Sequence, residues 1–358
     1  MALVVAAGIL PAVIRFARHV GAVDAPGGRR IHVGEIPRLG GIGIFLGFVG
    51  GVGAALLFTG RAQSLGEPTS PFPWVGAGFG ASLIFLTGLL DDLFQLSPRT
   101  KLLCQIGAAL VAVGFGVRVE TLAIPFGSTL DLGPWSPAIT LAWILVVTNA
   151  LNLLDGLDGL AGGFSLIVTL TMASVALRLN HFGVVVCAAA LTGALVAFLR
   201  YNFNPAKIFM GDGGSQFLGF LLAILSIRGS IKEATAVTLL LPLMVLGLPL
   251  ADLGTTVLRR AVRGGRATPL SLLRRIAHAD REHLHHNLID LGLSPRRAVL
   301  SLYLIAATFA LAGYLSVGDA NLPLAALVLA ASVAGIAAIK LAPSLAKGEP
   351  SAGPSEGA

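Results

Sequence analysis

Long apolar runs follow one another along almost the whole chain, with only short polar breaks between them. A helix needs roughly 20 apolar residues to cross the hydrocarbon core of a membrane. Only 12% of the residues are charged, against about a quarter in a typical soluble protein, so lipid must surround most of the chain. We therefore predict an all-α, polytopic integral membrane protein with about 11 transmembrane helices. The apolar windows lie near residues 2–18, 39–59, 73–90, 102–118, 137–154, 159–177, 182–199, 213–228, 234–257, 298–315 and 322–340.

The apolar runs form one unit, because no linker rich in Ser or Pro divides them. We expect a single multi-spanning domain over residues 1–341. Residues 342–358 end in GEPSAGPSEGA, which has no apolar periodicity and predicts a disordered cytoplasmic tail. At the other end, the first apolar run precedes Arg15 and Arg18. A cleaved signal peptide has the opposite order, so this run is expected to be the first span.

The positive charges predict the orientation in the membrane. With eleven spans the loops alternate between two sides, and 20 of the 25 Lys and Arg residues fall on one of them. Because positive loops face the cytoplasm, we expect the N-terminus outside a cell membrane and this charged side inside. Anionic lipids and substrates account for the net charge of +7 without nucleic acid. The cytoplasmic set comprises residues 15, 18, 29, 30, 38, 99, 101, 200, 207, 340 and 347 and the nine arginines between 259 and 297.

Five aspartates fall at span boundaries, all on the predicted cytoplasmic side: Asp91, Asp92, Asp155, Asp158 and Asp212. Asp91 and Asp92 end an apolar helix, where the negative end of the helix dipole disfavours carboxylates. Adjacent acids at such a boundary suit Mg²⁺, which takes one or two carboxylates and completes its shell with water and phosphate oxygens. The competing interpretation is a solvated turn.

Asp212 stands just before an apolar run, in FMGDGGSQFLG. This is the position of a helix N-cap, and a helix N-terminus is also an anion site. Capping and catalysis are both open here. Upstream, Asn202 and Phe209 could offer an amide and a flat apolar surface to a nucleobase.

The segment TNALNLLDGLDGLAGG places Asn149, Asn152, Asp155 and Asp158 at or beside a span. Polar side chains there are costly unless they are paired or used. They predict a functional site, with a polar seam between helices as the alternative.

The last cytoplasmic loop carries His283, His285 and His286 behind a run of arginines. Zinc is one interpretation, but no thiolate lies near and the spacing matches no metalloprotease motif. Phosphate recognition fits better. For any single arginine in this loop, membrane topology alone is a sufficient explanation.

Taken in order, these clusters resemble the polyprenyl-phosphate N-acetylhexosamine-1-phosphate transferase family (glycosyltransferase family 4). The segments that carry the resemblance are RRIHVGEIPRLGGIG, GLLDDLFQLSPRTKLLCQ, NALNLLDGLDGLAGG, YNFNPAKIFMGDGGSQFLG and ADREHLHHNLIDLGL. The first of them and the HLHH motif favour the branch that uses UDP-N-acetylglucosamine. One departure is Gln95, where many relatives have a further acid.

The resemblance implies that the phosphate of a polyprenyl phosphate (undecaprenyl or decaprenyl) attacks the sugar-linked phosphorus of a UDP-N-acetylhexosamine. The products are polyprenyl-diphospho-sugar and UMP, which begin a cell-wall or surface polysaccharide. It further implies a Mg²⁺ cofactor, with Mn²⁺ as a substitute, and a homodimer.

The resemblance also implies roles for particular residues. The catalytic set is Asp91, Asp92, Asp155 and Asp212, with Asp212, Asp91 and Asp92 at the metal. The substrate-binding set is Lys101, Asn149, Asp155, Asp158, Asn202, Phe209, His283, His285 and His286.

Two other functions are weighed against this one. The first is phospho-N-acetylmuramoyl-pentapeptide transferase, which runs the same chemistry on a peptide-bearing donor to make lipid I. The second is a cation-coupled lipid or solute transporter. Transporters place charged sites near the middle of the membrane, often between inverted repeats, whereas the acids here gather at one boundary and no repeat is visible.

Overall fold

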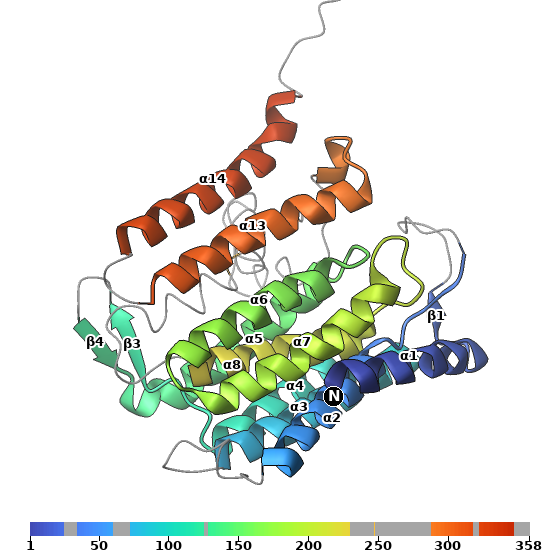
Figure 1. Cartoon of the computed structure of the whole chain (residues 1–358), viewed down its shortest axis with the longest axis horizontal. Helices are drawn as coiled ribbons and strands as arrows, with labels where there is room; N and C mark the ends of the chain where they lie inside the picture. Colours follow the sequence, from blue (N-terminus) through green and yellow to red (C-terminus); the bar gives the residue numbers. More distant parts are fainter. Residues whose placement is uncertain are drawn as a thin grey trace, which may run out of the picture.

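The computed structural model describes residues 1–24, 34–59, 72–124, 128–229, 247, 288–317 and 322–346, and most of them lie in helices (Figure 1). The helices are α1 (Ala2–His19), α2 (Gly41–Thr59), α3 (Phe72–Phe94), α4 (Pro98–Gly114), α5 (Ser136–Leu154), α6 (Leu160–Arg178), α7 (Phe182–Asn202), α8 (Gly211–Gly229), α13 (Pro295–Leu315) and α14 (Leu322–Ala346). Two short antiparallel pairs join β1 (Val23–Asp24) to β2 (Ile36–Pro37) and β3 (Thr121–Ile124) to β4 (Ser128–Asp131). A 3₁₀ turn, η2 (Gly133–Trp135), precedes α5.

The all-α prediction is confirmed, and ten of the eleven apolar windows coincide with these helices. The window at 234–257 lies outside the described residues. Within the described part of the chain, seven helices are long and apolar enough to cross a membrane, and α4, α8 and α14 are not among them. The count of eleven spans and the outward N-terminus stay predictions. Helix α14 continues to Ala346, past the predicted start of the tail, and residues 347–358 lie outside the description.

Helix α8 is the centre of the bundle. Every residue from Gly213 to Ile227 is buried, as expected for a helix that is apolar on all sides. Helices α2, α3, α5 and α6 pack around it. On one side the ring of Phe217 meets Phe45, Phe48 and Phe85 edge to face. The buried aromatic cluster keeps α8 in register with α2 and α3.

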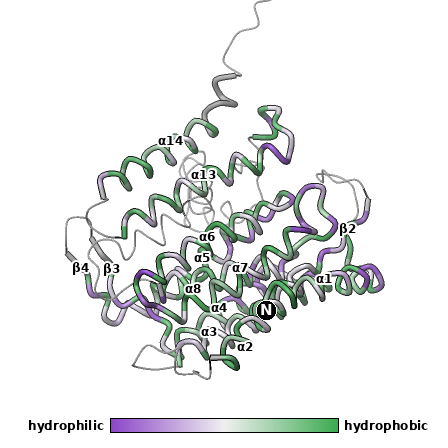
Figure 2. Tube along the Cα trace, viewed as in Figure 1, coloured by the Kyte–Doolittle hydropathy of each residue, from purple (hydrophilic) through white to green (hydrophobic). Residues whose placement is uncertain are grey.

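The outer helices form two further groups. Helices α1 and α2 pack on α7, and α13 packs on α6 and α14 (Figure 1). Apolar colour dominates the middles of the helices, while polar stretches gather at their ends and in the connecting loops (Figure 2). This distribution is the one expected of helices whose ends meet water and whose middles meet lipid or each other.

Local sequence explains where α4 begins. The hydroxyl of Ser97 accepts a hydrogen bond from the backbone N–H of Thr100 at 3.2 Å, and Pro98 occupies the first helical position. Both features are typical of helix N-termini. This sharp start after α3 brings Lys101 back beside the end of α3.

Glycines allow α3, α4 and α8 to approach closely. A Cβ on Gly80 of α3 would lie 2.6 Å from the ring of Phe220 and 2.8 Å from the carbonyl oxygen of Ala108. Such small-residue contacts are the usual means by which helices pack tightly in membranes.

We predict that Gly80→Ala lowers the thermal unfolding temperature of the purified protein. The added methyl must displace a helix backbone, and overpacking of this kind costs about 1–3 kcal/mol, more than the roughly 1 kcal/mol that alanine gains in helix propensity. Gly78→Ala, on the exposed face of the same helix with nothing within 4 Å of the new methyl, is the matched control. Equal unfolding temperatures for the two variants would contradict the packing described for α3.

Candidate functional site

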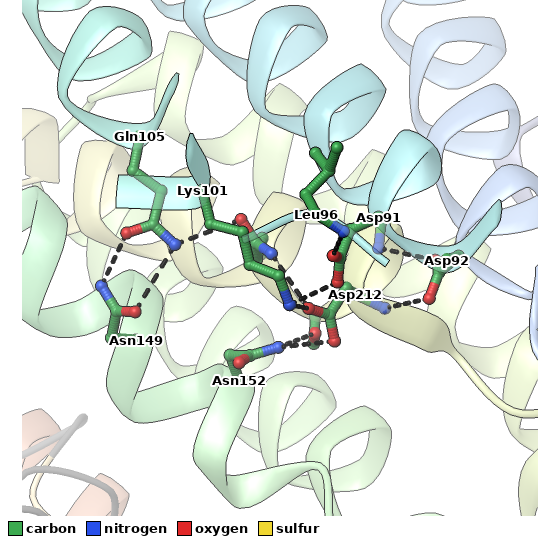
Figure 3. A network of polar contacts seen from close by, with 11 residues as sticks. Asp91, Asp92, Leu96, Lys101, Gln105, Asn149, Asn152 and Asp212 are labelled. Carbon is green, nitrogen blue, oxygen red and sulfur yellow. Dashed lines mark hydrogen bonds and ion pairs between the residues drawn. The ribbon is translucent and has the colours of Figure 1, made fainter. Parts of the chain in front are cut away.

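Charged and amide side chains from four helices meet where α3 ends and α8 begins (Figure 3). Helix α3 contributes Asp91 and Asp92 in its last turn, and α8 contributes Asp212 in its first turn. Lys101 comes from α4 and Asn152 from α5. Segments that are 120 residues apart in the chain are thus joined directly.

Asp92 caps α8. Its two carboxylate oxygens accept hydrogen bonds from the backbone N–H groups of Asp212 at 2.9 Å and Gly213 at 3.0 Å. These are amides that a helix N-terminus leaves without a partner, and the positive end of the helix dipole favours the carboxylate. The expectation that Asp212 caps its own helix is therefore wrong, and so is the expectation that these amides are open to an anion.

Close backbone approach makes this cap possible. Gly211 has φ +73°, and a Cβ there would lie 2.5 Å from the Asp92 carboxylate. A Cβ on Gly88 of α3 would lie 2.5 Å from the carbonyl oxygen of Asp212. Glycine at both positions lets the end of α3 touch the start of α8.

Asp91 points to the other side, toward Lys101. One of its oxygens accepts a hydrogen bond from the backbone N–H of Leu96 at 2.7 Å, and the other forms an ion pair with the Lys101 ammonium. Asp91 and Asp92 are only 8% and 6% exposed. The interpretation of this pair as a solvated turn is therefore wrong.

Asp212 lies between Lys101 and Asn152. The Lys101 Nζ is 2.9 Å from Asp212 Oδ2, and Asn152 Nδ2 donates to Asp212 Oδ1 at 3.2 Å. Asn152 also donates to the hydroxyl of Ser215 at 2.8 Å, and Gln216 donates to Asp212 Oδ2 at 3.3 Å. The carboxylate of Asp212 is thus oriented from three directions.

A second layer of amides lies deeper in the bundle. The Gln105 side-chain N–H₂ donates to Gln216 at 3.2 Å and to Asn149 at 3.4 Å, while Asn149 donates back to Gln105 at 2.9 Å. Asn149, expected to touch substrate, thus has the contacts of the alternative interpretation, a polar seam between α4, α5 and α8. Substrate contact by Asn149 stays a prediction.

Sequence reasoning missed Gln105 and Gln216. A signal existed, because each lies four residues after a charged site residue, Lys101 and Asp212 respectively, inside an apolar run. Residues four apart share a helix face, and amides within spans are conspicuous. Arg38, which follows β2 and acts electrostatically on Asp92, was also outside the predicted site.

Asp155 follows the last residue of α5 and differs from the other aspartates. Among the described residues, no donor forms a hydrogen bond with its carboxylate. Desolvation by the surrounding protein raises the pKa of Asp155 to about 7, and the negative charges of Asp212, Asp92 and Asp158 act in the same direction. A carboxyl group with this pKa can hold or release a proton near neutral pH.

Asp158 and Asn202 join the loop after α5 to the loop after α7. Asp158 Oδ2 accepts from Asn204 Nδ2 and from the backbone N–H of Ala206, both at 3.0 Å. Asn202 accepts from the backbone N–H of Gly159 at 3.0 Å and is 3% exposed. The nucleotide contacts predicted for both side chains stay predictions, and the structure adds a role in shaping the loops.

The backbone of Phe209 forms hydrogen bonds with the end of β2 and the linker between β2 and α2. Its N–H donates to the carbonyl oxygen of Pro37 at 2.7 Å, and its carbonyl oxygen accepts from Gly40 at 2.9 Å. Its side chain is half-buried, so contact with a base stays a prediction. His283, His285, His286 and the arginines from 259 to 281 lie outside the described residues.

The carboxylates suit a Mg²⁺ ion that is bound partly by the protein and partly by substrate phosphates. Within the described ranges no group of three or more His, Cys, Asp or Glu residues is placed to enclose a metal. Asp91 and Asp212 nevertheless converge on one cation, Lys101. Two carboxylates suffice for Mg²⁺ when water and phosphate oxygens complete its shell. Asp92 is set apart because both of its oxygens serve the α8 cap.

Comparison with known proteins agrees with this site. The family model "Glycosyl transferase family 4" matches residues 74–230, which include all five aspartates. A Bacillus subtilis protein named "Probable undecaprenyl-phosphate N-acetylglucosaminyl 1-phosphate transferase" is 35% identical over 85% of this chain and 79% of its own length. A Mycobacterium tuberculosis "Decaprenyl-phosphate N-acetylglucosaminephosphotransferase" is 38% identical over 75% of this chain and 69% of its own length.

A more distant relative is the Yersinia pestis "Undecaprenyl-phosphate alpha-N-acetylglucosaminyl 1-phosphate transferase", 29% identical over 65% of this chain and 63% of its own length. These matches and the seven apolar helices confirm the predicted multi-pass membrane protein. The resemblance seen in the motifs is also confirmed: the chain belongs to glycosyl transferase family 4.

Proposed function

We propose that the protein transfers N-acetylglucosamine-1-phosphate from UDP-N-acetylglucosamine to a polyprenyl phosphate, giving polyprenyl-diphospho-N-acetylglucosamine and UMP. The observation that carries the proposal is the pair of carboxylates, Asp91 and Asp212, held around one cation at the end of a buried helix. The names of the relatives support the branch that uses UDP-N-acetylglucosamine over the lipid I branch. Such a product would begin a cell-wall or surface polysaccharide.

In the proposed reaction an oxygen of the lipid phosphate forms a bond to the sugar-linked phosphorus, and the bond from that phosphorus to the UMP oxygen breaks. Catalysis of phosphoryl transfer is mostly positioning and charge neutralisation. Lys101 provides a positive charge for the pyrophosphate, and Asn152 and Gln216 orient Asp212. Mg²⁺ held by Asp91 and Asp212 would neutralise phosphate charge during the transfer.

Asp155 is a group in this site that can accept or release a proton. Its pKa of about 7 allows both protonation states at neutral pH. The second pKa of a phosphate monoester is near 6, so much of the lipid phosphate is already dianionic and the reaction does not depend on a dedicated base. Some of the lipid phosphate is still monoanionic at neutral pH, and we assign to Asp155 the role of accepting its remaining proton.

The location of the acids counts against the transporter alternative. Asp91 and Asp92 are in the last turn of α3, and Asp212 is in the first turn of α8. A coupling site of a transporter would sit near the middle of its helices. We propose, from the distribution of positive charge, that this end of the bundle faces the cytoplasm at the cell membrane. The homodimer stays a prediction.

The first test is release of UMP by the purified protein in detergent, given UDP-N-acetylglucosamine, undecaprenyl phosphate and Mg²⁺. We expect release only when lipid and metal are both present, and none in excess EDTA. Asp212→Asn should reduce the rate by at least about 100-fold, since it removes a charge that acts on the transition state. Asp290→Asn is the control, because it neutralises an exposed aspartate in the segment that precedes α13. Undiminished turnover in EDTA would exclude the metal assignment.

A second test uses the pH dependence of stability. The pKa of Asp155 rises from 3.8 to about 7 on folding, so the folded state binds the proton more tightly and this group's contribution to stability falls as pH rises between these values. Asp155→Asn should therefore raise the unfolding temperature at pH 8, where the wild-type carboxylate is charged and partly desolvated, and change it little at pH 4. Thermal scans at both pH values measure this. If Asp155→Asn changed the unfolding temperature by the same amount at pH 4 and at pH 8, the raised pKa of Asp155 would be excluded.

A further inference from the structure

Lys101 occupies the point on which the site carboxylates converge. Its ammonium forms ion pairs with Asp91 Oδ2 and with Asp212 Oδ2, the latter at 2.9 Å, and the Lys101 side chain is 29% exposed (Figure 3). One positive charge thus joins two negative ones. The three groups together keep one net negative charge.

The other carboxylate oxygens of the three aspartates have protein donors. Asp92 uses both oxygens for the α8 amides. Asp91 Oδ1 accepts from Leu96, and Asp212 Oδ1 accepts from Asn152. The two oxygens that face Lys101, Asp91 Oδ2 and Asp212 Oδ2, are the ones held by a cation, and Asp212 Oδ2 also accepts from Gln216 at 3.3 Å.

We propose that Lys101 and the divalent cation compete for Asp91 Oδ2 and Asp212 Oδ2, and that metal binding releases Lys101 to the phosphates of the donor. This inference rests on the proposed function for the identity of the donor. Replacement of the ammonium contact by Mg²⁺ adds two positive charges beside the carboxylates of Asp91 and Asp212 and keeps the lysine charge in the site. The site is thus less negative with metal than without it, and attracts an anionic donor more strongly.

The exchange links metal and donor thermodynamically. The donor pyrophosphate offers the released ammonium a new anionic partner, so donor binding favours the metal-bound arrangement. Coupling between two ligands is reciprocal, and metal must strengthen donor binding by the same factor. Lys101 is in this account the group through which both ligands act.

Metal affinity tests the competition directly. We would titrate the purified full-length protein with Mn²⁺, without donor or acceptor, and measure free Mn²⁺ by electron paramagnetic resonance. Lys101→Met should bind Mn²⁺ about 10-fold more tightly than wild type, because the two oxygens no longer have a cationic partner. Lys207→Met is the matched control, because it removes the same charge from an exposed lysine in the loop before α8. The Mn²⁺ affinity of this variant should stay within about two-fold of wild type.

A second measurement on the wild-type protein covers the case in which Lys101→Met does not fold. Acetylation of individual lysines, read by mass spectrometry, should show that Lys101 becomes several-fold more reactive as Mn²⁺ is added, while Lys207 does not change. Equal or weaker Mn²⁺ binding by a folded Lys101→Met, or unchanged labelling of Lys101 at saturating Mn²⁺, would overturn the competition. Neither measurement involves turnover, so UMP release with no competition would reject this inference alone, and competition without UMP release would reject the proposed reaction alone.

Discussion

The site depends on the hydrogen bonds that two first-turn amides of α8, those of Asp212 and Gly213, donate to the carboxylate of Asp92. Helix α8 is buried along nearly its whole length, and its polar N-terminus would be costly to bury without a partner. Asp92 satisfies that end and at the same time holds it against the last turn of α3. The carboxylates of Asp91, which precedes Asp92 in α3, and of Asp212 in the first turn of α8 are thereby placed beside Lys101.

This arrangement also explains how several charges are tolerated inside the bundle. An isolated buried carboxylate is strongly destabilising, whereas a paired and hydrogen-bonded one is not. Asp91, Asp92 and Asp212 each have charged or amide partners. Among the described residues, the charges that act on Asp155 are unfavourable, and together with desolvation they raise its pKa to about 7. What sets Asp155 apart from these three acids is that no described donor forms a hydrogen bond with its carboxylate.

Much of this could be predicted from sequence. The apolar windows predicted the helices, because a span of roughly 20 residues is a strong local signal, and the motif order predicted the family and the five aspartates. The roles within the pair Asp91 and Asp92 could not be predicted. Neighbours in a helix point about 100° apart, and which of them faced α8 depended on packing. Local position likewise suggested that Asp212 caps α8, whereas the cap comes from a residue 120 positions away.

The fate of the donor's second phosphate tests the central claim most directly. The protein would be given UDP-N-acetylglucosamine with ³²P in the sugar-linked phosphate, together with undecaprenyl phosphate and Mg²⁺, and the lipid and aqueous fractions would be counted. A sugar-phosphate transferase moves the label into the lipid and leaves unlabelled UMP. Label that stays in water as UDP while sugar enters the lipid would contradict the account, because it would show transfer of the sugar without its phosphate.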